Sequence, residues 1–141
     1  MIVHWPAGLK VQRDGFVRAR GHVIDLMATA LDVAGAQLPA TFAGQAPHPL
    51  QGTSLLPLLQ GQLNLPNYPP LFGEHENGRS VITPDGWKLV RDRGESAWHL
   101  YDLSVDESEL HDVIADNVDR AHTMEAMWDQ WARENQVLPK P

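Results

Sequence analysis

A long stretch rich in proline, glycine and glutamine, residues 36–70, divides this chain of 141 residues into two parts. It contains one short apolar segment, which predicts a single helical turn around residues 54–60. A connection of this length is uncommon inside a compact domain and usually marks a functional loop or a linker. The whole chain has the length of one ordinary domain. We therefore expect two structural units, neither of which is a full domain.

The part before this connection is short and unusually apolar. Residues 22–34 are good helix formers that end at Gly35, which suits a left-handed C-terminal cap. Apolar side chains lie nearly all round the expected helix, a pattern typical of helices covered on most sides. Residues 2–5 predict a short strand that stops at Pro6, and a strand needs partners for its backbone groups. We therefore expect this part to belong to a larger structure.

The part after the connection is rich in strand-forming residues. Four runs predict strands at 71–74, 79–82, 87–90 and 98–101. A proline, an aspartate and a glycine at 84–86 are typical of a tight turn between two of them. These runs together predict a small antiparallel meander.

The C-terminal residues 118–135 show the clearest helical pattern. An apolar stripe at i, i+3, i+7 and i+10 is formed by Ala121, Met124, Trp128 and Trp131. Either Asp116 or Asn117 is expected to cap the start of this helix. Tryptophans at core spacing favour packing over a platform for a ligand. The expected fold class is therefore α+β, with the helix laid across the sheet.

Composition and charge exclude several classes of protein. The formal net charge of −7 argues against nucleic-acid and anionic-membrane partners. No apolar run approaches the ~18 residues that a membrane span needs. The chain has no cysteine, which excludes disulfides, thiolate metal sites and cysteine nucleophiles. The compartment stays open.

The densest group of chemically able side chains lies in residues 74–79 (EHENGR). Carboxylates, an imidazole and a guanidinium at this spacing can bind an anion, hold a metal ion or move protons. In an extended strand, however, Glu74 and Glu76 face one way and His75 the other, so three ligands do not converge on one ion. The local pattern leaves open a plain polar turn and a metal site.

Other polar residues favour structural roles. His22 and His99 are expected to be hydrogen-bonded structural histidines. Glu109, His111 and Asp112 belong to an acidic loop that we expect to be solvated. The sequence contains no Gly-rich phosphate loop, no Gly-x-Ser-x-Gly and no His-Glu-x-x-His. Local chemistry alone therefore names no reaction.

An ordered set of segments over nearly the whole chain carries the strongest functional signal. The segments are VHWP (3–6), HVIDLMATALDVAG (22–35), LQGTSLLPLLQG (50–61), EHENGRSV (74–81), DGWKLV (85–90), WHLYDLS (98–104), DESELHD (106–112) and WDQWA (128–132). In this order they resemble the C-terminal third of bacterial sulfatases of the arylsulfatase type, within the alkaline-phosphatase-like superfamily. The resemblance explains the orphan strand, the apolar helix and the long connection.

The resemblance implies a fold in two parts. Residues 1–60 would be the C-terminal tail of a large α/β catalytic domain. Residues 68–141 would be the small C-terminal subdomain, an antiparallel four-stranded sheet packed against a long helix. The missing N-terminal catalytic domain is then the expected partner of this chain.

The resemblance also implies chemistry that this chain does not carry. Sulfatases hydrolyse sulfate esters with a formylglycine, made from the first residue of Cys/Ser-x-Pro-x-Arg, and with a calcium ion. This chain has no cysteine, and none of its serines begins that motif. We expect no catalytic residue and no metal ligand here, and no activity from the chain alone. Calcium and formylglycine are implied only for the full-length enzyme, whose family makes a periplasmic or extracellular location an option.

The resemblance assigns one group of residues to the substrate. It places Glu74, His75, Asn77 and Arg79 near the mouth of the catalytic cleft, where the small subdomain contributes to the pocket. His75 and Asn77 are the residues expected to contact the organic part of a sulfate ester. The alternative is a hydrogen-bonded loop that stabilises the contact between the two domains.

Other functions stay open beside this one. A phosphonate monoester or phosphodiester hydrolase shares the metal-assisted chemistry, and a non-catalytic module would bind a partner or glycan. A small metallohydrolase using His75 with neighbouring carboxylates is a further alternative. Without a covering domain, strand 2–5 and helix 22–34 would expose apolar surface, whose burial contributes ~25 cal/mol per Å². We therefore also expect formation of a homo-oligomer, exchange between copies or poor order.

Overall fold

A computed structural model describes residues 1–10, 17–65 and 67–137 of the chain. Residues 11–16, 66 and 138–141 lie outside the described residues, and the first and last of these ranges belong to the expected parts 1–60 and 68–141. The chain divides into two compact units, Met1–Tyr68 (unit 1) and Pro69–Pro141 (unit 2). The division falls near the C-terminal end of the long polar connection.

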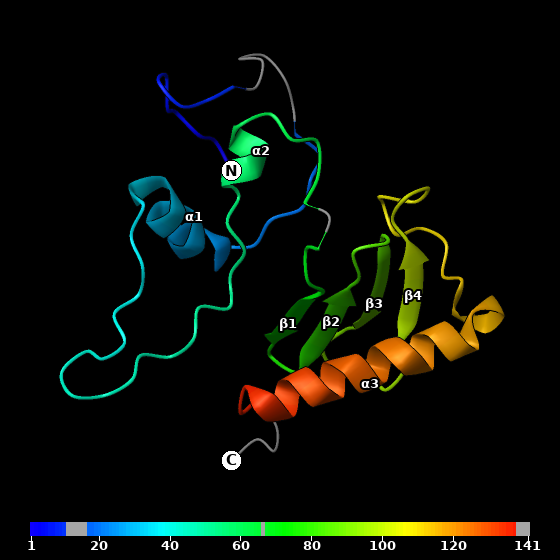
Figure 1. Ribbon diagram of the computed structural model, residues 1–141. Helices are drawn as coiled ribbons and strands as arrows, with labels where there is room; N and C mark the ends of the chain where they lie inside the picture. The colour runs from blue at the N-terminus through cyan, green and yellow to red at the C-terminus, as the bar shows by residue number, and fades with distance from the viewer. Residues whose placement is uncertain (11–16, 66, 138–141) are drawn as a thin grey trace. The chain divides into compact units, whose positions relative to one another are not determined.

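Unit 2 contains a four-stranded antiparallel sheet in the order β1-β2-β3-β4 (Figure 1). The strands are β1 (Leu71–His75), β2 (Gly78–Ile82), β3 (Trp87–Arg91) and β4 (His99–Asp102). Each strand pairs with the next one in the chain, so the sheet is a simple meander. All four expected strands are confirmed, with ends that move by a residue or so.

The connection between β1 and β2 is a two-residue turn. His75 pairs with Gly78, and the two residues between them, Glu76 and Asn77, have φ angles of 50° and 76°. Two successive positive φ angles are the mark of a type I′ turn, whose twist matches that of the flanking strands. This turn makes residues 74–79 a tight hairpin end.

Helix α3 (Val118–Glu134) crosses one face of the sheet (Figure 1). Between them lies the core of unit 2, formed by Val81, Leu89, Leu100, Ala121, Met124, Trp128 and Ala132. The expected stripe is confirmed: its first three members are buried, and Trp131 packs against the core while stacking on Phe72 at 5.3 Å between ring centroids. The α+β class is therefore confirmed.

The start of α3 differs from the expectation. Asn117 occupies the N-cap position, but no side chain caps the helix. Its amide Nδ2 instead donates to the carbonyl of Val113 at 2.9 Å, across the short 3₁₀ turn η1 (Ile114–Asp116). The amide is thus used to close the turn that precedes the helix, and the expected side-chain cap is wrong.

The described residues of unit 1 form two helices, α1 (Asp25–Ala34) and α2 (Leu56–Leu59). Gly35 ends α1 with a φ of 62°, so the expected left-handed cap is confirmed. The helix begins three residues later than residue 22, because the N–H groups of Asp25 and Leu26 donate to the carbonyls of His22 and Val23 in a tighter i→i−3 turn. The side chain of Asp25 accepts the backbone N–H of His22 at 2.6 Å. The helical turn expected around residues 54–60 is α2.

The expected strand at residues 2–5 is wrong. These residues adopt no strand, and Ile2 is 99% exposed. The carbonyl of Trp5 accepts hydrogen bonds from the N–H groups of Gly8 and Leu9, which turns the chain. Within the described residues no segment pairs with this one, and an extended segment without a neighbour leaves its backbone groups unpaired.

Helix α1 exposes most of its apolar surface. Only Asp25 and Ala28 are buried in it, whereas Leu26 and Met27 are 50% and 58% exposed. The expectation that this helix is covered on most sides therefore fails for the chain by itself.

Among the described residues, no helix combines the length and apolar character that crossing a membrane requires.

Candidate functional site

The hairpin end formed by residues 74–79 is the candidate site. Glu74, at the end of β1, accepts a hydrogen bond on Oε1 from the backbone N–H of Asn77 at 2.9 Å. This bond closes the turn on itself and helps hold two residues in positive-φ conformations. Glu74 therefore has a structural task in the hairpin, while His75 and Asn77 are exposed at its tip.

Glu76 does not share a strand face with Glu74, as an extended strand would require. It lies in the turn, where its carboxylate pairs with the guanidinium of Arg93, which follows β3. Both partners are largely exposed, so this pair stabilises the fold little. The sequence-based placement of the two carboxylates on one face is thus wrong, because β1 ends at His75 and Glu76 is the first residue of the turn.

Arg79, at the start of β2, is directed toward α3 and away from the tip. Its guanidinium carbon lies 4.4 Å from the ring centroid of Trp128, and its Nη1 is 3.9 Å from Asp129 Oδ1. Burial lowers the pKa of Arg79, and the neighbouring charge of Arg91 lowers it further. The group stays charged, since guanidinium groups do not deprotonate in proteins. Arg79 therefore joins the hairpin to the helix.

Trp128 fixes the hairpin from the helix side. Its Nε1 donates to the carbonyl of Gly73 in β1 at 3.0 Å, and its ring is fully buried. Trp98 meets the same ring edge-on at 6.3 Å between centroids. Because a site held by regular elements is more rigid than one on a free loop, the tip carrying His75 and Asn77 is well supported.

The hairpin does not provide a metal centre. Over the part of the chain that the structure describes, no three His, Cys, Asp or Glu side chains come together in a group able to hold a metal ion. The sequence also has no Cys and no Ser-x-Pro-x-Arg. These residues therefore fit neither a calcium ion nor a formylglycine, and we assign no ligand or precursor for either group.

The structure reveals a buried carboxylate whose partners the sequence did not indicate. Asp25 is 1% exposed, and its Oδ2 accepts from the backbone N–H of His22 and from the hydroxyl of Tyr68. Its Oδ1 accepts from the backbone N–H of Thr53 at 2.8 Å. The only sequence signal is an aspartate at the start of an apolar run. This cluster ties α1 to the segment that leads into α2.

A close backbone approach completes the Asp25 cluster. A Cβ at Gly52 would lie 2.2 Å from the carbonyl oxygen of Ile24, so only glycine fits there. The hydroxyl of Thr29, one turn further along α1 than Asp25, donates to the carbonyl of Asp25 and accepts from the N–H of Leu55 at 2.9 Å. Every member of the cluster binds backbone or another member, which favours a structural role.

The acidic loop is more ordered than expected. Asp112 accepts from the backbone N–H groups of Leu100 and Ile114, both at 3.0 Å, and from the ring of His99. Glu109 accepts two hydrogen bonds from the Nζ of Lys88 at 2.6 and 2.7 Å. The loop is thus exposed at His111 and Asp112, as expected of a solvated loop, but Glu109 is half-buried and both carboxylates also hold protein partners. The structural role of His99 is confirmed.

Solved structures of other proteins share this fold. Ps i-CgsB is 21% identical with a TM-score of 0.70, and the match covers 92% of this chain and 27% of that one. BT4656, solved with its substrate D-glucosamine-2-N,6-O-disulfate, is 20% identical with a TM-score of 0.58, covering 82% and 24%. BT1596, a 2-O GAG sulfatase, is 24% identical with a TM-score of 0.58, covering 79% and 24%.

The fold is thus that of a part of sulfatase chains, and this chain spans about a quarter of the length of each. The family model described as N-sulphoglucosamine sulphohydrolase, C-terminal, matches residues 1–136. The chain belongs to this family of sulfatase C-terminal regions. The resemblance of the ordered sequence segments to the C-terminal part of a sulfatase is thereby confirmed.

Proposed function

We propose that this chain is the C-terminal part of a sulfuric ester hydrolase, which completes the fold of that enzyme and is inactive alone. The family match over residues 1–136 is the observation that carries this proposal. In it, residues 1–60 form the tail of the large catalytic domain and residues 68–141 the small subdomain. Calcium and formylglycine belong to the preceding catalytic part, where they would stabilise charge and supply the nucleophile.

The exposed face of α1 is the proposed contact with that catalytic part. Leu26, Met27 and Val33 are 50%, 58% and 44% exposed and lie on a helix whose other side carries the Asp25 cluster. Covering such side chains stabilises an assembly by roughly 25 cal/mol per Å² of apolar surface. In the absence of the catalytic part, the same face would drive formation of a homo-oligomer.

The finer class that we propose is an arylsulfatase-type enzyme whose natural substrate is a sulfated amino sugar. Two facts support the sulfated amino sugar as substrate class: the family description names N-sulphoglucosamine, and BT4656 was solved with D-glucosamine-2-N,6-O-disulfate as its substrate. An aryl sulfate would then serve as a chromogenic surrogate for an O-sulfate, because both are sulfate esters, whereas an N-sulfate is a sulfamate with an S–N bond.

In this enzyme the hairpin tip would line the substrate cleft. His75 and Asn77 are exposed and would contact the organic part of the ester, while Glu74 and Arg79 hold them in place. The imidazole and the amide both donate and accept hydrogen bonds, which suits recognition of sugar hydroxyls. The competing role is a loop that only stabilises the contact between the two domains.

The proposal is tested with the 141-residue chain alone and with the longer protein that includes the catalytic part. We expect no hydrolysis of an aryl sulfate by the chain with calcium added, and turnover by the longer protein. Turnover by the chain alone that disappears in His75→Ala would overturn the proposal in favour of a complete metallohydrolase site. Turnover of a phosphodiester but not of a sulfate would favour the related hydrolases, and no turnover in either form would favour a binding module.

Variants of the hairpin tip in the longer protein test its role. Asn77→Gly removes the amide but keeps a residue that tolerates positive φ. We expect His75→Ala and Asn77→Gly to raise KM for a sulfated amino sugar about tenfold, with little change for the smaller aryl sulfate. The matched control is Thr123→Ala, an exposed position on α3. Equal loss on both substrates, together with a lower Tm, would instead indicate the domain-contact role.

A further inference from the structure

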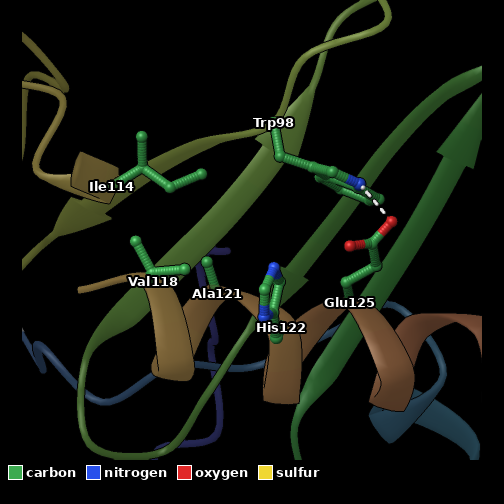
Figure 2. A pocket seen from close by; sticks show the side chains of 6 residues that line it. All are labelled: Trp98, Ile114, Val118, Ala121, His122 and Glu125. Carbon is green, nitrogen blue, oxygen red and sulfur yellow. Dashed lines mark hydrogen bonds between the residues drawn. The ribbon is translucent and has the colours of Figure 1, made fainter.

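Unit 2 has a small pocket beside the N-terminal half of α3 (Figure 2). It is lined by Trp98, Ile114, Val118, Ala121, His122 and Glu125. We propose that this pocket binds one neutral sugar ring. Binding there needs only these six side chains and does not depend on hydrolysis of a sulfate ester.

The pocket has the size of a single ring. The volume of the whole pocket is about 160 Å³, below the ~300 Å³ at which pockets begin to enclose drug-sized ligands. Ala121, Ile114 and Val118 lie on one side, and the indole of Trp98 forms the wall above α3 (Figure 2). An indole gives a flat apolar surface on which the C–H face of a pyranose can pack.

The polar part of the pocket is one oriented carboxylate and one imidazole. Glu125 Oε1 accepts a hydrogen bond from Trp98 Nε1 at 2.8 Å, drawn in Figure 2. This bond fixes the carboxylate against the indole wall and leaves Oε2 as an acceptor. Among the described residues no hydrogen bond engages the ring of His122, which borders the same space. The site therefore offers both an acceptor and a group that can donate or accept.

The charges around the pocket favour a neutral ligand. Glu125 opposes an anionic ring such as a sulfated sugar, since no cationic side chain lines the pocket. Glu125 attracts a cationic amine, but the guanidinium of Arg91, outside the lining at 5.3 Å from the ring centroid of Trp98, offsets part of that attraction. Sugar hydroxyls can donate to Glu125 without carrying charge. An apolar face with hydroxyls at its edge thus matches both parts of the pocket.

The test follows the indole N–H resonance of Trp98 in the 141-residue chain, assigned by its loss in Trp98→Phe. We expect methyl β-D-glucopyranoside to shift it saturably, with a dissociation constant of about 1 mM, a weak affinity fitting one ring. Glucose 6-sulfate and ethylamine should shift it less at equal concentration. Absence of a saturable shift, or a larger shift with either charged probe, would overturn the proposal.

Variants on the exposed side of the pocket keep the test independent of folding. His122→Ala should weaken sugar binding about tenfold, and Val118→Tyr should fill the pocket and abolish it. Thr123→Ala is the control, because Thr123 is exposed next to His122 but does not line the pocket. Unchanged affinity in both pocket variants would overturn the assignment of this site, whatever the activity of the longer protein.

Discussion

The hydroxyl of Tyr68 donates a hydrogen bond to the buried carboxylate of Asp25, 43 positions earlier in the chain. Burial raises the pKa of Tyr68 well above its usual range, and the bond to Asp25 and its charge raise it further. The phenol is therefore always protonated and always able to donate. Since Tyr68 is the last residue of unit 1, this bond fixes the end of the unit to the first turn of α1.

We expect Tyr68→Phe to weaken protection of α1 against hydrogen exchange. A hydrogen bond to a charged group contributes about 1.5–3 kcal/mol, so the free energy of local opening should fall by that amount. The measurement is native-state exchange of the α1 amides. Tyr101→Phe in β4 is the matched control, and a fall of similar size in that variant would contradict a specific role of the Asp25 bond.

The close approach at Gly52 makes a second prediction. Gly52→Ala places a Cβ 2.2 Å from the carbonyl oxygen of Ile24, a backbone atom that cannot rotate away. We expect a loss of at least about 1–3 kcal/mol in the free energy of unfolding of unit 1, as for overpacked interiors. A Cβ added at Gly21 would meet a methyl carbon of Leu55 at 3.4 Å, an ordinary contact. Gly21→Ala should therefore change the free energy of unfolding of unit 1 by less than about 1 kcal/mol. Urea titration of both variants would show equal losses if the contact is unimportant.

We expect His99 to make the stability of unit 2 depend on pH. Its hydrogen bond to Asp112 raises the pKa of His99, burial lowers it by less, and the charges of Asp112 and Glu95 add to the rise. Because the pKa of His99 is higher in the folded than in the unfolded state, protonated His99 stabilises the fold. This stabilisation is fully present below the unfolded pKa of about 6.5 and is lost as pH rises through the folded pKa.

The measurement is the urea midpoint of unit 2 against pH. The wild-type midpoint should fall relative to that of His99→Gln as the pH rises above about 6.5. The control is His111→Gln, because the side chain of His111 is 80% exposed. Parallel pH profiles for wild type and His99→Gln would rule out this contribution.

We expect truncation of Trp128 to cause a large loss of packing in the core of unit 2. Its side chain is 0% exposed in the core, and its Nε1 binds the carbonyl of Gly73. Trp128→Ala should lower the free energy of unfolding by about 3–5 kcal/mol. The half-buried Met127 next to it is the control, for which Met127→Ala should have a smaller effect on the Tm of unit 2. An equal loss of stability in both variants would contradict a central role of Trp128 in the core of unit 2.

Much of unit 2 could be predicted from the sequence because its elements follow local patterns. The stripe of Ala121, Met124 and Trp128 repeats at helical spacing, and each of these side chains is buried. The hairpin tip was harder: the reversal at Glu76 and Asn77 uses positive φ angles in residues that also occur in strands. Treating Glu76 as part of an extended strand put the two carboxylates on the same face.

Unit 1 shows where local patterns fail. Residues 2–5 have strand-like composition, but a strand forms only against a neighbouring segment, and composition does not contain that information. The apolar run beginning near residue 22 predicted a helix, yet its first residues fold back so that the N–H of His22 reaches Asp25. The Asp25 carboxylate satisfies an N–H that has no acceptor within a helix, and tertiary contacts of Asp25 fix where the regular helix starts.

The sequence by itself determined the meander, the amphipathic α3, the left-handed end of α1 at Gly35 and the resemblance to sulfatases. Each depends on the spacing or order of residues along the chain. Only the tertiary structure decided that Asp25 is held by Thr53 and Tyr68, 28 and 43 positions away, and that Trp98 and Glu125 meet at one pocket. Such pairs join polar groups that are distant in the chain, and burial of both partners selects them only after the backbone has folded.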